Sequence, residues 1–272
     1  MENFSKTICE LKHDFVKSYS GNSHTTEILP NSTSSIIKIN NEYLLLLHKF
    51  LKNNPIYSNI ITKKILGTEC TIFEGDLNNY WIDSIKHDAS YAPFYPTWML
   101  SGLSLAIEAQ NLGYEQIIDI GSGDGRIAYC GKILGLNSIS IEIDENLIGI
   151  QENISKKTGI LFNPICADAT IYDFDEIPEK KSIFVIGGVP EIGEVLAESV
   201  VKNALETVHI KNPSFILTGS HSHRKFSRDT TNFGWGTIIK KFQLSIISTI
   251  SLPTYWTMDQ EFETPYVFTK KG

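Results

Sequence analysis

Beyond about residue 91, short apolar runs alternate with longer segments in which apolar residues recur at helical spacing. Most of the runs are continuous and rich in β-branched residues, as in strands that are buried on both faces of a parallel sheet. We therefore predict an α/β domain in which helices flank a mostly parallel sheet. The predicted strands span residues 116–120, 138–143, 164–167, 182–186, 214–218, 244–250 and 266–269, and the helices between them span 127–134, 145–158 and 192–207.

The last two predicted strands have no clear helix between them, so we expect an antiparallel pair at an edge of the sheet. Another helix is predicted ahead of the sheet, over residues 97–112. Gly113 follows this segment and is its expected C-terminal stop.

The first 90 residues have a different texture, with many Asn, Ser, Lys and Ile residues and weak periodicity. Residues 42–51 indicate a short buried helix, residues 21–35 a loop, and residues 70–73 a strand. We expect residues 1–90 to form a mainly helical extension and residues 91–272 to form the main domain. The extension is either a lid or substrate region, or it packs against the domain without such a role.

Composition narrows the classes of partner. The 272 residues are 42% hydrophobic and carry a formal net charge of −7, which favours a packed globular protein without a general attraction to nucleic-acid phosphates. A nucleic-acid partner is thus disfavoured, although a local basic patch would still permit one. The amino-terminal segment lacks the apolar core of a signal peptide, and no stretch reaches the roughly 18 apolar residues of a membrane span. We expect a cytoplasmic protein without a membrane partner.

The four cysteines, Cys9, Cys70, Cys130 and Cys166, are scattered and form no CxxC pair. No histidine cluster accompanies them at metal-ligand spacing, so we expect no metal site. Single cysteines of this kind suit buried apolar positions in a reducing compartment.

The most informative segment is IIDIGSGDGR, residues 117–126, in which a strand leads directly into a glycine-rich turn and then a helix. Gly121, Gly123 and Gly125 allow the backbone to turn sharply and to approach a ligand closely. A dinucleotide-binding fingerprint would require a third glycine at position 126, where this chain has Arg126. Asp119, at the end of the strand, is poorly placed beside a pyrophosphate and well placed for an amino group.

Two more carboxylates follow at the ends of the next two predicted strands. Glu142 could accept hydrogen bonds from both hydroxyls of a ribose, and Asp168 could bind an adenine amino group. Asp168 could equally be an ordinary cap for the segment after it. Because the carboxyl ends of parallel strands meet at one edge of a sheet, Asp119, Glu142 and Asp168 should line the same ligand-binding edge.

This arrangement resembles the class I S-adenosylmethionine-dependent methyltransferases, over roughly residues 91–272 and most specifically over 116–169. The resemblance implies a Rossmann-like seven-stranded sheet with one antiparallel strand near an edge, and S-adenosylmethionine as the cofactor. It implies a cofactor-binding set made up of Tyr91, Thr97, Asp119, Gly121, Ser122, Gly123, Gly125, Glu142, Ile143, Asp168, Ala169 and Gly187.

A local resemblance is narrower. The motif DIGSGDGR followed by SIEID, with YAPFYPTWML ahead of it, is similar to lysine methyltransferases of the non-SET kind. In that group an upstream Tyr- and Pro-containing segment closes over the cofactor, which makes Tyr91, Pro96 and Thr97 the candidates. Plain aromatic packing at the start of a helix would explain the segment equally well.

The residues that would serve the methyl acceptor are less clear. After the strand 182–186 come Gly187 and Gly188, which let a ligand approach the backbone, and Glu191 is the nearest acid. The Asp/Asn-Pro-Pro-aromatic signature of enzymes that methylate exocyclic base amines does not occur at this point. The segment 219–236 combines basic and aromatic residues that could hold an anionic or planar substrate, or could form a solvated loop. Glu191 and His221 are the weak catalytic candidates.

The sequence thus predicts a methyltransferase that acts on a protein side chain, a lysine-like amine. A small-molecule acceptor is the alternative within the same class, and a catalytically silent S-adenosylmethionine-binding module is the alternative from another class. A nicotinamide oxidoreductase is disfavoured by Arg126.

Overall fold

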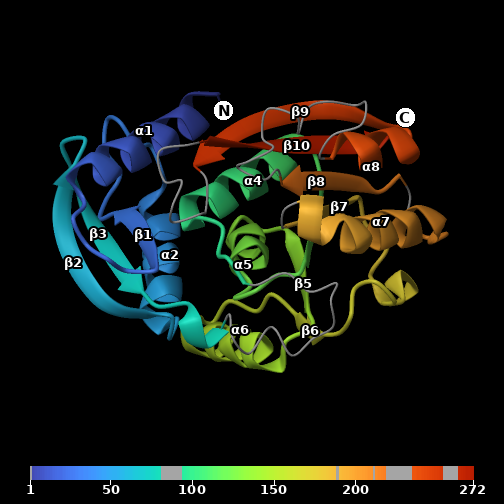
Figure 1. The fold of residues 1–272 in the computed structure, drawn as a ribbon, viewed down its shortest axis with the longest axis horizontal. Coiled ribbons are helices and arrows are strands. Elements are labelled where there is room, and N and C mark those ends of the chain that lie inside the picture. Colours follow the sequence, from blue (N-terminus) through green and yellow to red (C-terminus); the bar gives the residue numbers. More distant parts are fainter. Residues whose placement is uncertain (1, 81–93, 188–189, 211, 219–234, 254–262) are drawn as a thin grey trace.

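The computed structural model describes residues 2–80, 94–187, 190–210, 212–218, 235–253 and 263–272, except for the side chains of residues 2, 3, 190–193 and 218. Seven strands form its main sheet: β4 (Gln116–Ile120), β5 (Asn137–Glu142), β6 (Pro164–Cys166), β7 (Ser182–Ile186), β8 (Ser214–Thr218), β9 (Leu244–Pro253) and β10 (Glu263–Lys271). Their order is β6-β5-β4-β7-β8-β10-β9 (Figure 1). In this sheet β10 runs antiparallel to both of its neighbours, β8 and β9, and the other described pairings are parallel. The predicted α/β class with a mostly parallel seven-stranded sheet is confirmed.

Helices cover both faces of this sheet. On one face lie α4 (Met99–Asn111), α5 (Arg126–Ile133) and α6 (Glu145–Thr158), and on the other lie α7 (Pro190–Glu206), α8 (Gly236–Lys241) and the short 3₁₀ helix η1 (Phe174–Glu176). Because side chains alternate along a strand, Ile117 joins the hydrophobic cluster on the first face, whereas Ile118 and Ile120 join the cluster on the second. The result is three layers with a core on each side of the sheet.

The strand order fixes where a ligand is expected. The chain passes from β4 to β5 and β6 on one side, and then returns to place β7 on the other side of β4. This reversal beside β4 is a topological switch point. In open α/β sheets, ligands bind outside the carboxyl ends of the strands at such a point.

The carboxyl-terminal strands differ from their predicted positions. The antiparallel pairing of β9 and β10 is confirmed, but β10 lies inside the sheet between β8 and β9, and only β9 is at the edge. Both strands are also longer than predicted, because polar residues such as Ser251 and Thr264 continue the pairing past the apolar runs. An apolar run marks the buried centre of a strand and not its ends.

The amino-terminal region, residues 2–80, has helices and a small sheet that are separate from the main sheet. We call it the N-terminal unit. It contains α1 (Glu2–Ser18), β1 (Thr25–Pro30), α2 (Asn41–Asn53), β2 (Tyr57–Ile65) and β3 (Thr68–Gly75). The three strands form an antiparallel sheet in the order β1-β3-β2. The helix predicted over 42–51 is confirmed, and the strand predicted over 70–73 lies within β3.

One expectation for this region is wrong, because residues 21–35, expected to be a loop, contain β1, every residue of which is buried. The extension also has a sheet beside its helices, which the expectation of a mainly helical extension did not include. The strand β1 was not predicted because three of its residues, Thr25, Thr26 and Glu27, are polar. Their burial depends on partners that lie far away in the sequence. Tertiary contacts therefore override the local polar pattern here.

The N-terminal unit shares its core with the main sheet. Helix α1 packs against β9 and α4, and α2 packs against α5 and α6 (Figure 1). One hydrophobic cluster includes Phe15 of α1, Phe50 of α2, Leu103 of α4 and Tyr266 of β10. A single packed interior thus spans the two parts of the chain.

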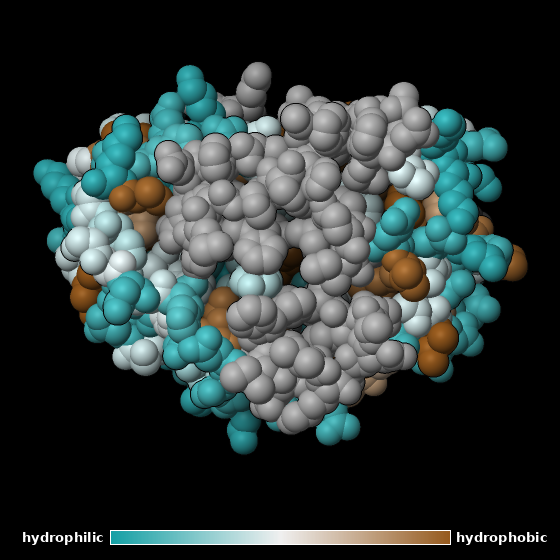
Figure 2. All heavy atoms as spheres, in the orientation of Figure 1, coloured by the Kyte–Doolittle hydropathy of each residue, from teal (hydrophilic) through white to brown (hydrophobic). Residues whose placement is uncertain are grey.

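The described surface is mainly polar. In the face drawn in Figure 2, polar residues predominate in the described parts, and apolar residues stand singly or in small groups. The large exposed apolar side chains, such as Ile60 and Val208, come from separate elements. Within the described residues, no helix is long and apolar enough to cross a membrane.

Candidate ligand-binding turn

The chain passes from β4 to α5 through residues 121–125, which we call the glycine turn. Gly121, Gly123 and Gly125 have φ angles of 61°, 58° and 78°. This left-handed region is unfavourable for residues that carry a Cβ, so the backbone conformation itself requires glycine at the three positions. The turn lies at the carboxyl end of β4, at the switch point of the sheet.

Close packing is a second reason for glycine at two of these positions. A Cβ on Gly123 would lie 2.1 Å from Cε2 of Phe94, and one on Gly125 would lie 2.5 Å from the ring of Phe162. Phe94 precedes α4, so the described end of the segment 91–97 crosses the glycine turn. Nothing in the sequence pattern distinguished Phe94 from its aromatic neighbours.

Glu142, the last residue of β5, holds the turn from one side. Its Oε2 accepts a hydrogen bond from the amide of Gly123 at 2.7 Å, and its Oε1 accepts bonds from the amides of Ile143 and Asp144 at 2.9 and 3.1 Å. Burial raises the pKa of Glu142 to about 7, against the lowering effect of these three bonds. A carboxylate offers roughly four lone-pair sites, so acceptor capacity remains for a ligand hydroxyl.

Asp119 lies beneath the turn with 2% of its surface exposed. Its Oδ2 accepts a hydrogen bond from the amide of Ala128 in α5 at 3.3 Å. Burial holds the pKa of Asp119 well above its usual range, and the nearby carboxylates of Asp124 and Glu142 raise it further. An added cation would relieve this unfavourable charge.

Gln151 of α6 fixes the backbone of the turn. Its Nε2 donates to the carbonyl of Gly123 at 2.7 Å and to Oγ of Ser122 at 3.0 Å, while its Oε1 accepts from Oγ of Ser140 at 2.6 Å. All of these groups are buried. Gln151 is a site residue that the sequence did not reveal, because its role depends on how α6 packs.

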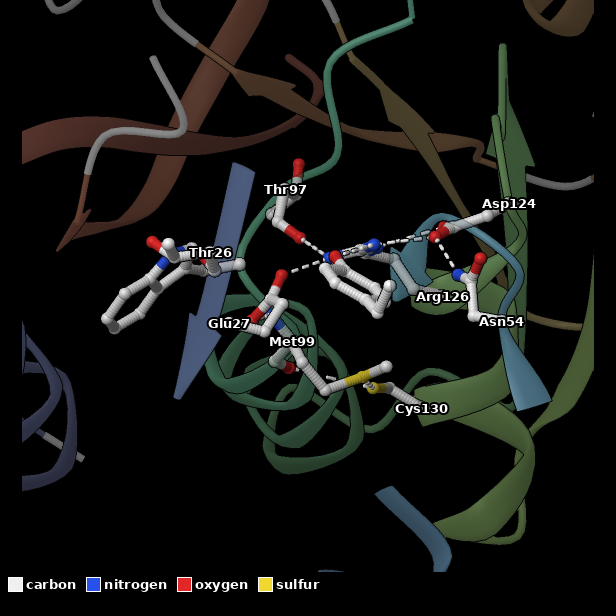
Figure 3. Close-up of polar contacts among 10 residues, drawn as sticks. Thr26, Glu27, Asn54, Thr97, Met99, Asp124, Arg126 and Cys130 are labelled. Atoms are coloured by element: carbon white, nitrogen blue, oxygen red, sulfur yellow. Dashed lines mark hydrogen bonds and ion pairs between the residues drawn. The ribbon is translucent and has the colours of Figure 1, made fainter. Parts of the chain in front are cut away.

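In the sequence, Arg126 indicated only that the dinucleotide fingerprint is absent. In the structure, its side chain joins the glycine turn to the N-terminal unit. Its guanidinium, 2% exposed, donates from Nε and Nη2 to the two oxygens of Asp124 and from Nη2 to the hydroxyl of Tyr57. It also donates from Nη1 to Glu27 and to the carbonyl of Thr97 (Figure 3). Residues from β1, β2 and the segment before α4 therefore meet at this side chain.

The charges around the turn do not balance. Asp124 and Glu27 both pair with Arg126, and the buried Lys12 lies near Glu27 as a second basic group, with its pKa lowered to about 7 by burial. Asp119 and Glu142 add two more buried acids at the same turn. In their ionised form these acids make the site electronegative, and a cationic ligand favours that form whereas a pyrophosphate opposes it.

The other predicted cofactor residues lie at varied positions. Gly187 follows β7 and has open space where a Cβ would be, Ile143 is partly exposed, and Ala169 is buried. Asp168 accepts two bonds through Oδ1, from the amide and the hydroxyl of Thr170, so it caps the turn that follows β6. This is the capping role that the sequence left open for it, and it does not exclude a ligand contact.

Several candidates fall where the structure gives no description. Tyr91, His221 and most of the segment 219–236 lie outside the described residues, and so does the side chain of Glu191. At the end of that segment, Trp235 is fully buried in the core beside α8, so it is not available to hold a substrate as predicted. Among the described side chains, no group of His, Cys, Asp and Glu could hold a metal ion.

Comparisons with known proteins give similarity at the level of structure alone. No protein-family model and no curated protein matches the sequence. Among solved structures, TrmN from Thermus thermophilus is 12% identical with a TM-score of 0.45, and the match covers 76% of this chain and 57% of TrmN.

Two further structures are similar to the same extent. Ribosomal protein L11 methylase from Lactobacillus delbrueckii subsp. bulgaricus is 12% identical with a TM-score of 0.43, over 64% of this chain and 79% of that one. Trm5 from Methanocaldococcus jannaschii, in complex with adenosine, is 13% identical with a TM-score of 0.44, over 65% and 50%. We base the fold on the strand order and the site on its own geometry.

Proposed function

We propose that the chain binds S-adenosylmethionine at the glycine turn and transfers its methyl group. The observation that carries this proposal is the excess of buried carboxylates around a turn whose three glycines have left-handed φ angles. S-Adenosylmethionine carries an ammonium and a sulfonium, both cationic. A nicotinamide dinucleotide would instead bring a pyrophosphate to the same acids, where it would be repelled.

Each side chain has a role under this proposal. Asp119 pairs with the ammonium of the methionine moiety, and Glu142 accepts from the ribose with the acceptor capacity that its three backbone bonds leave. Asp168 and Ala169 lie beyond β6, where they would contact the adenine. Gly121, Ser122 and Gly123 line the turn itself, and Gly187 leaves room at the end of β7 for the reacting groups.

In methyl transfer, the main task of the protein is to align the nucleophile with the methyl group. Methyl transfer is a direct displacement at a sulfonium carbon, in which the nucleophile forms a bond to the methyl group and the thioether leaves. Holding the two reactants in line can supply about 7–11 kcal/mol of the barrier. A base is needed only where the nucleophile arrives protonated, as a lysine does.

For the acceptor, we propose a protein side chain with a lysine-like amine. The support is local: the described end of the segment 91–97 crosses the glycine turn through Phe94, and the carbonyl of Thr97 binds Arg126. A small molecule is the second candidate acceptor. A silent module that binds S-adenosylmethionine without transferring the methyl group is the candidate from outside the enzymes.

The test is calorimetry with S-adenosylhomocysteine and with NAD, on the wild type and on Asp119→Ala and Glu142→Ala variants. We expect the wild type to bind S-adenosylhomocysteine and not NAD, and each variant to bind at least about tenfold more weakly, as for a lost charged hydrogen bond. Failure of the wild type to bind, or unchanged binding in both variants, would refute the proposed site.

Labelled S-adenosylmethionine in a cell extract then addresses the acceptor. Label in the protein fraction supports the proposed acceptor, and label in the metabolite fraction supports the small-molecule alternative. Binding without any transfer identifies a silent module.

A further inference from the structure

The N-terminal unit reaches into the glycine turn with three side chains. We propose that Glu27, Asn54 and Tyr57 are positioning residues that set the affinity of the turn for its ligand, so that ligand binding and docking of the N-terminal unit depend on each other. This inference rests on the proposed function for the identity of the ligand. It adds a role for residues that the function itself does not require.

Asn54 makes the most direct link. Its Nδ2 donates to Oδ2 of Asp124 at 2.8 Å, and its own Oδ1 accepts from the amide of Ile56 at 3.1 Å. Asn54 is 2% exposed and Asp124 is fully buried. Because Asp124 lies between Gly123 and Gly125, Asn54 holds the middle of the turn, whereas Glu142 holds the amide of Gly123.

Glu27 and Tyr57 act through Arg126. Tyr57 accepts from Nη2 of Arg126 at 3.0 Å, and Glu27 pairs with Nη1 (Figure 3). The second oxygen of Glu27 accepts from the amide of Met99 at 3.0 Å, which ties β1 to the first residue of α4. The N-terminal unit therefore fixes the orientation of the guanidinium that also pairs with Asp124.

The contacts that Glu142 and Gln151 make with the turn do not replace those of the N-terminal unit. Glu142 and Gln151 hold the amide and the carbonyl of Gly123, whereas the described hydrogen bonds of the Asp124 carboxylate come from Asn54 and Arg126. Removal of the N-terminal contacts would leave a buried guanidinium and carboxylate with fewer partners. Such groups are costly to bury, so the turn would rearrange to reach water.

A coupling of this kind works in both directions. If docking of the N-terminal unit favours the ligand-binding shape of the turn, bound ligand must favour docking by the same factor. A scaffold that supports the fold alone would show no such reciprocity. This difference separates a positioning role from a structural one.

The first test measures the affinity for S-adenosylhomocysteine by calorimetry in Tyr57→Phe and Asn54→Ala. Each change removes an uncharged side-chain partner of Asp124 or Arg126 and leaves the charged groups in place, so these variants should fold even where Glu27→Gln does not. We expect binding weaker by on the order of tenfold in each. The matched control is Tyr129→Phe, which removes a 2.8 Å bond to the carbonyl of Leu46 between α5 and α2, away from the turn. Its affinity should equal that of the wild type.

The second test follows amide hydrogen exchange in β1 and in residues 54–57 with and without S-adenosylhomocysteine. We expect the ligand to slow exchange there in the wild type and in Tyr129→Phe, and to slow it less in Tyr57→Phe. A stability loss alone would raise exchange in all states without removing the effect of the ligand.

The outcomes are distinguishable. If the wild type binds no S-adenosylhomocysteine, the proposed function fails and this inference fails with it. If the wild type binds, but Tyr57→Phe and Asn54→Ala bind equally well, or the ligand leaves exchange in the N-terminal unit unchanged, this inference alone is overturned. An affinity loss in Tyr129→Phe as large as in Tyr57→Phe would also overturn it, because the loss would then not depend on the contacts that Glu27, Asn54 and Tyr57 make with Asp124 and Arg126.

Discussion

At position 123, a single methyl group is enough to disturb the site. The backbone has a φ of 58° there, and the Cβ of an alanine would lie 2.1 Å from the Phe94 ring. Gly135 offers a comparison, because its φ is 86° but no atom lies within 4 Å of the added Cβ. Both glycines therefore have a left-handed backbone conformation, but only at Gly123 would an added Cβ collide with a neighbouring side chain.

We expect Gly135→Ala to lose about 1–2 kcal/mol of unfolding free energy, the cost of the left-handed conformation. Gly123→Ala should lose more, and it should also lose affinity for S-adenosylhomocysteine, because Phe94 or the turn must move. Urea unfolding and calorimetry on the pair measure both effects. Equal losses of stability together with unchanged affinity would show that Phe94 does not pack on the turn as described.

Glu142 should make stability depend on pH. Its pKa in the folded state is about 7, above the usual value of 4.5. A raised pKa favours the protonated form, so this stabilisation is complete below about pH 4.5 and is lost as the pH rises through 7. At about 1.4 kcal/mol per pKa unit, the total effect is on the order of 3 kcal/mol.

Urea unfolding of the wild type and of Glu142→Gln between about pH 4.5 and about pH 8 measures this contribution. The stability of the wild type relative to the variant should fall across that window. A constant difference would mean that Glu142 has an ordinary pKa. The comparison with the variant removes the titration of groups that do not interact with Glu142.

At the scale of elements, the start of α6 connects Glu142 to the glycine turn. Asp144 caps this helix, with its Oδ1 accepting from the amides of Asn146 and Leu147 at 2.8 and 3.3 Å. The amide of Asp144 in turn donates to Glu142, and Gln151 lies further along the same helix. The start of α6 thus positions two of the groups that hold the turn.

Asp144→Ala should lower the unfolding free energy by about 1 kcal/mol, the usual value of such a cap. It should also weaken binding of S-adenosylhomocysteine, because a frayed first turn releases Glu142. Asp144→Asn retains a capping oxygen and should restore most of both losses. If Asn and Ala behave alike in chemical unfolding and calorimetry, the cap does not support the site.

Strands could be predicted from the sequence where their buried residues are also apolar. Strands such as β4 and β7 are buried along their whole length and were predicted with the correct bounds from their apolar runs. The strand β1 is equally buried, but three of its residues are polar and find their partners only in the folded structure. The interior position of β10 depends on the order of strands in space, which periodicity does not encode.

The same division holds for the site. Asp119, Glu142 and the glycines were predicted because their chemistry is local to one motif and to strand ends. Phe94, Gln151 and Asn54 were missed because they contact the turn from segments that lie elsewhere in the chain. Asp124 and Arg126 stood inside the motif, and an acid and a base on the two sides of Gly125 were the signal that could have indicated them.

At the scale of the whole molecule, the two packed faces of the sheet leave one cysteine accessible. Cys9, Cys70 and Cys130 are buried, whereas Cys166 is exposed, contrary to the expectation of buried roles for all four. Burial raises the pKa of Cys9 and of Cys70 to about 12. Cys166 is the last residue of β6, and its Sγ lies 3.9 Å from the carbonyl oxygen of Ile143, which follows β5.

We expect an aromatic disulfide reagent to modify one thiol in the native protein and all four in denaturant. Saturating S-adenosylhomocysteine should slow the native reaction, because Ile143 borders the proposed site. Cys166→Ser should abolish native labelling and leave the other thiols to react only after unfolding. Fast labelling of a second thiol would contradict the packing of α1, β3 or α5.

The ion pair between Glu27 and Arg126 also bears on how the chain folds. The two residues are 99 positions apart, so a very large loop must close before the guanidinium can leave water. Contacts of such long range form slowly, because the entropy of loop closure is lost before the contact stabilises anything. A refolding chain would therefore pair the strands around β4 before it completes the turn. In stopped-flow refolding, ligand-binding competence should accordingly appear in a later phase than the secondary structure.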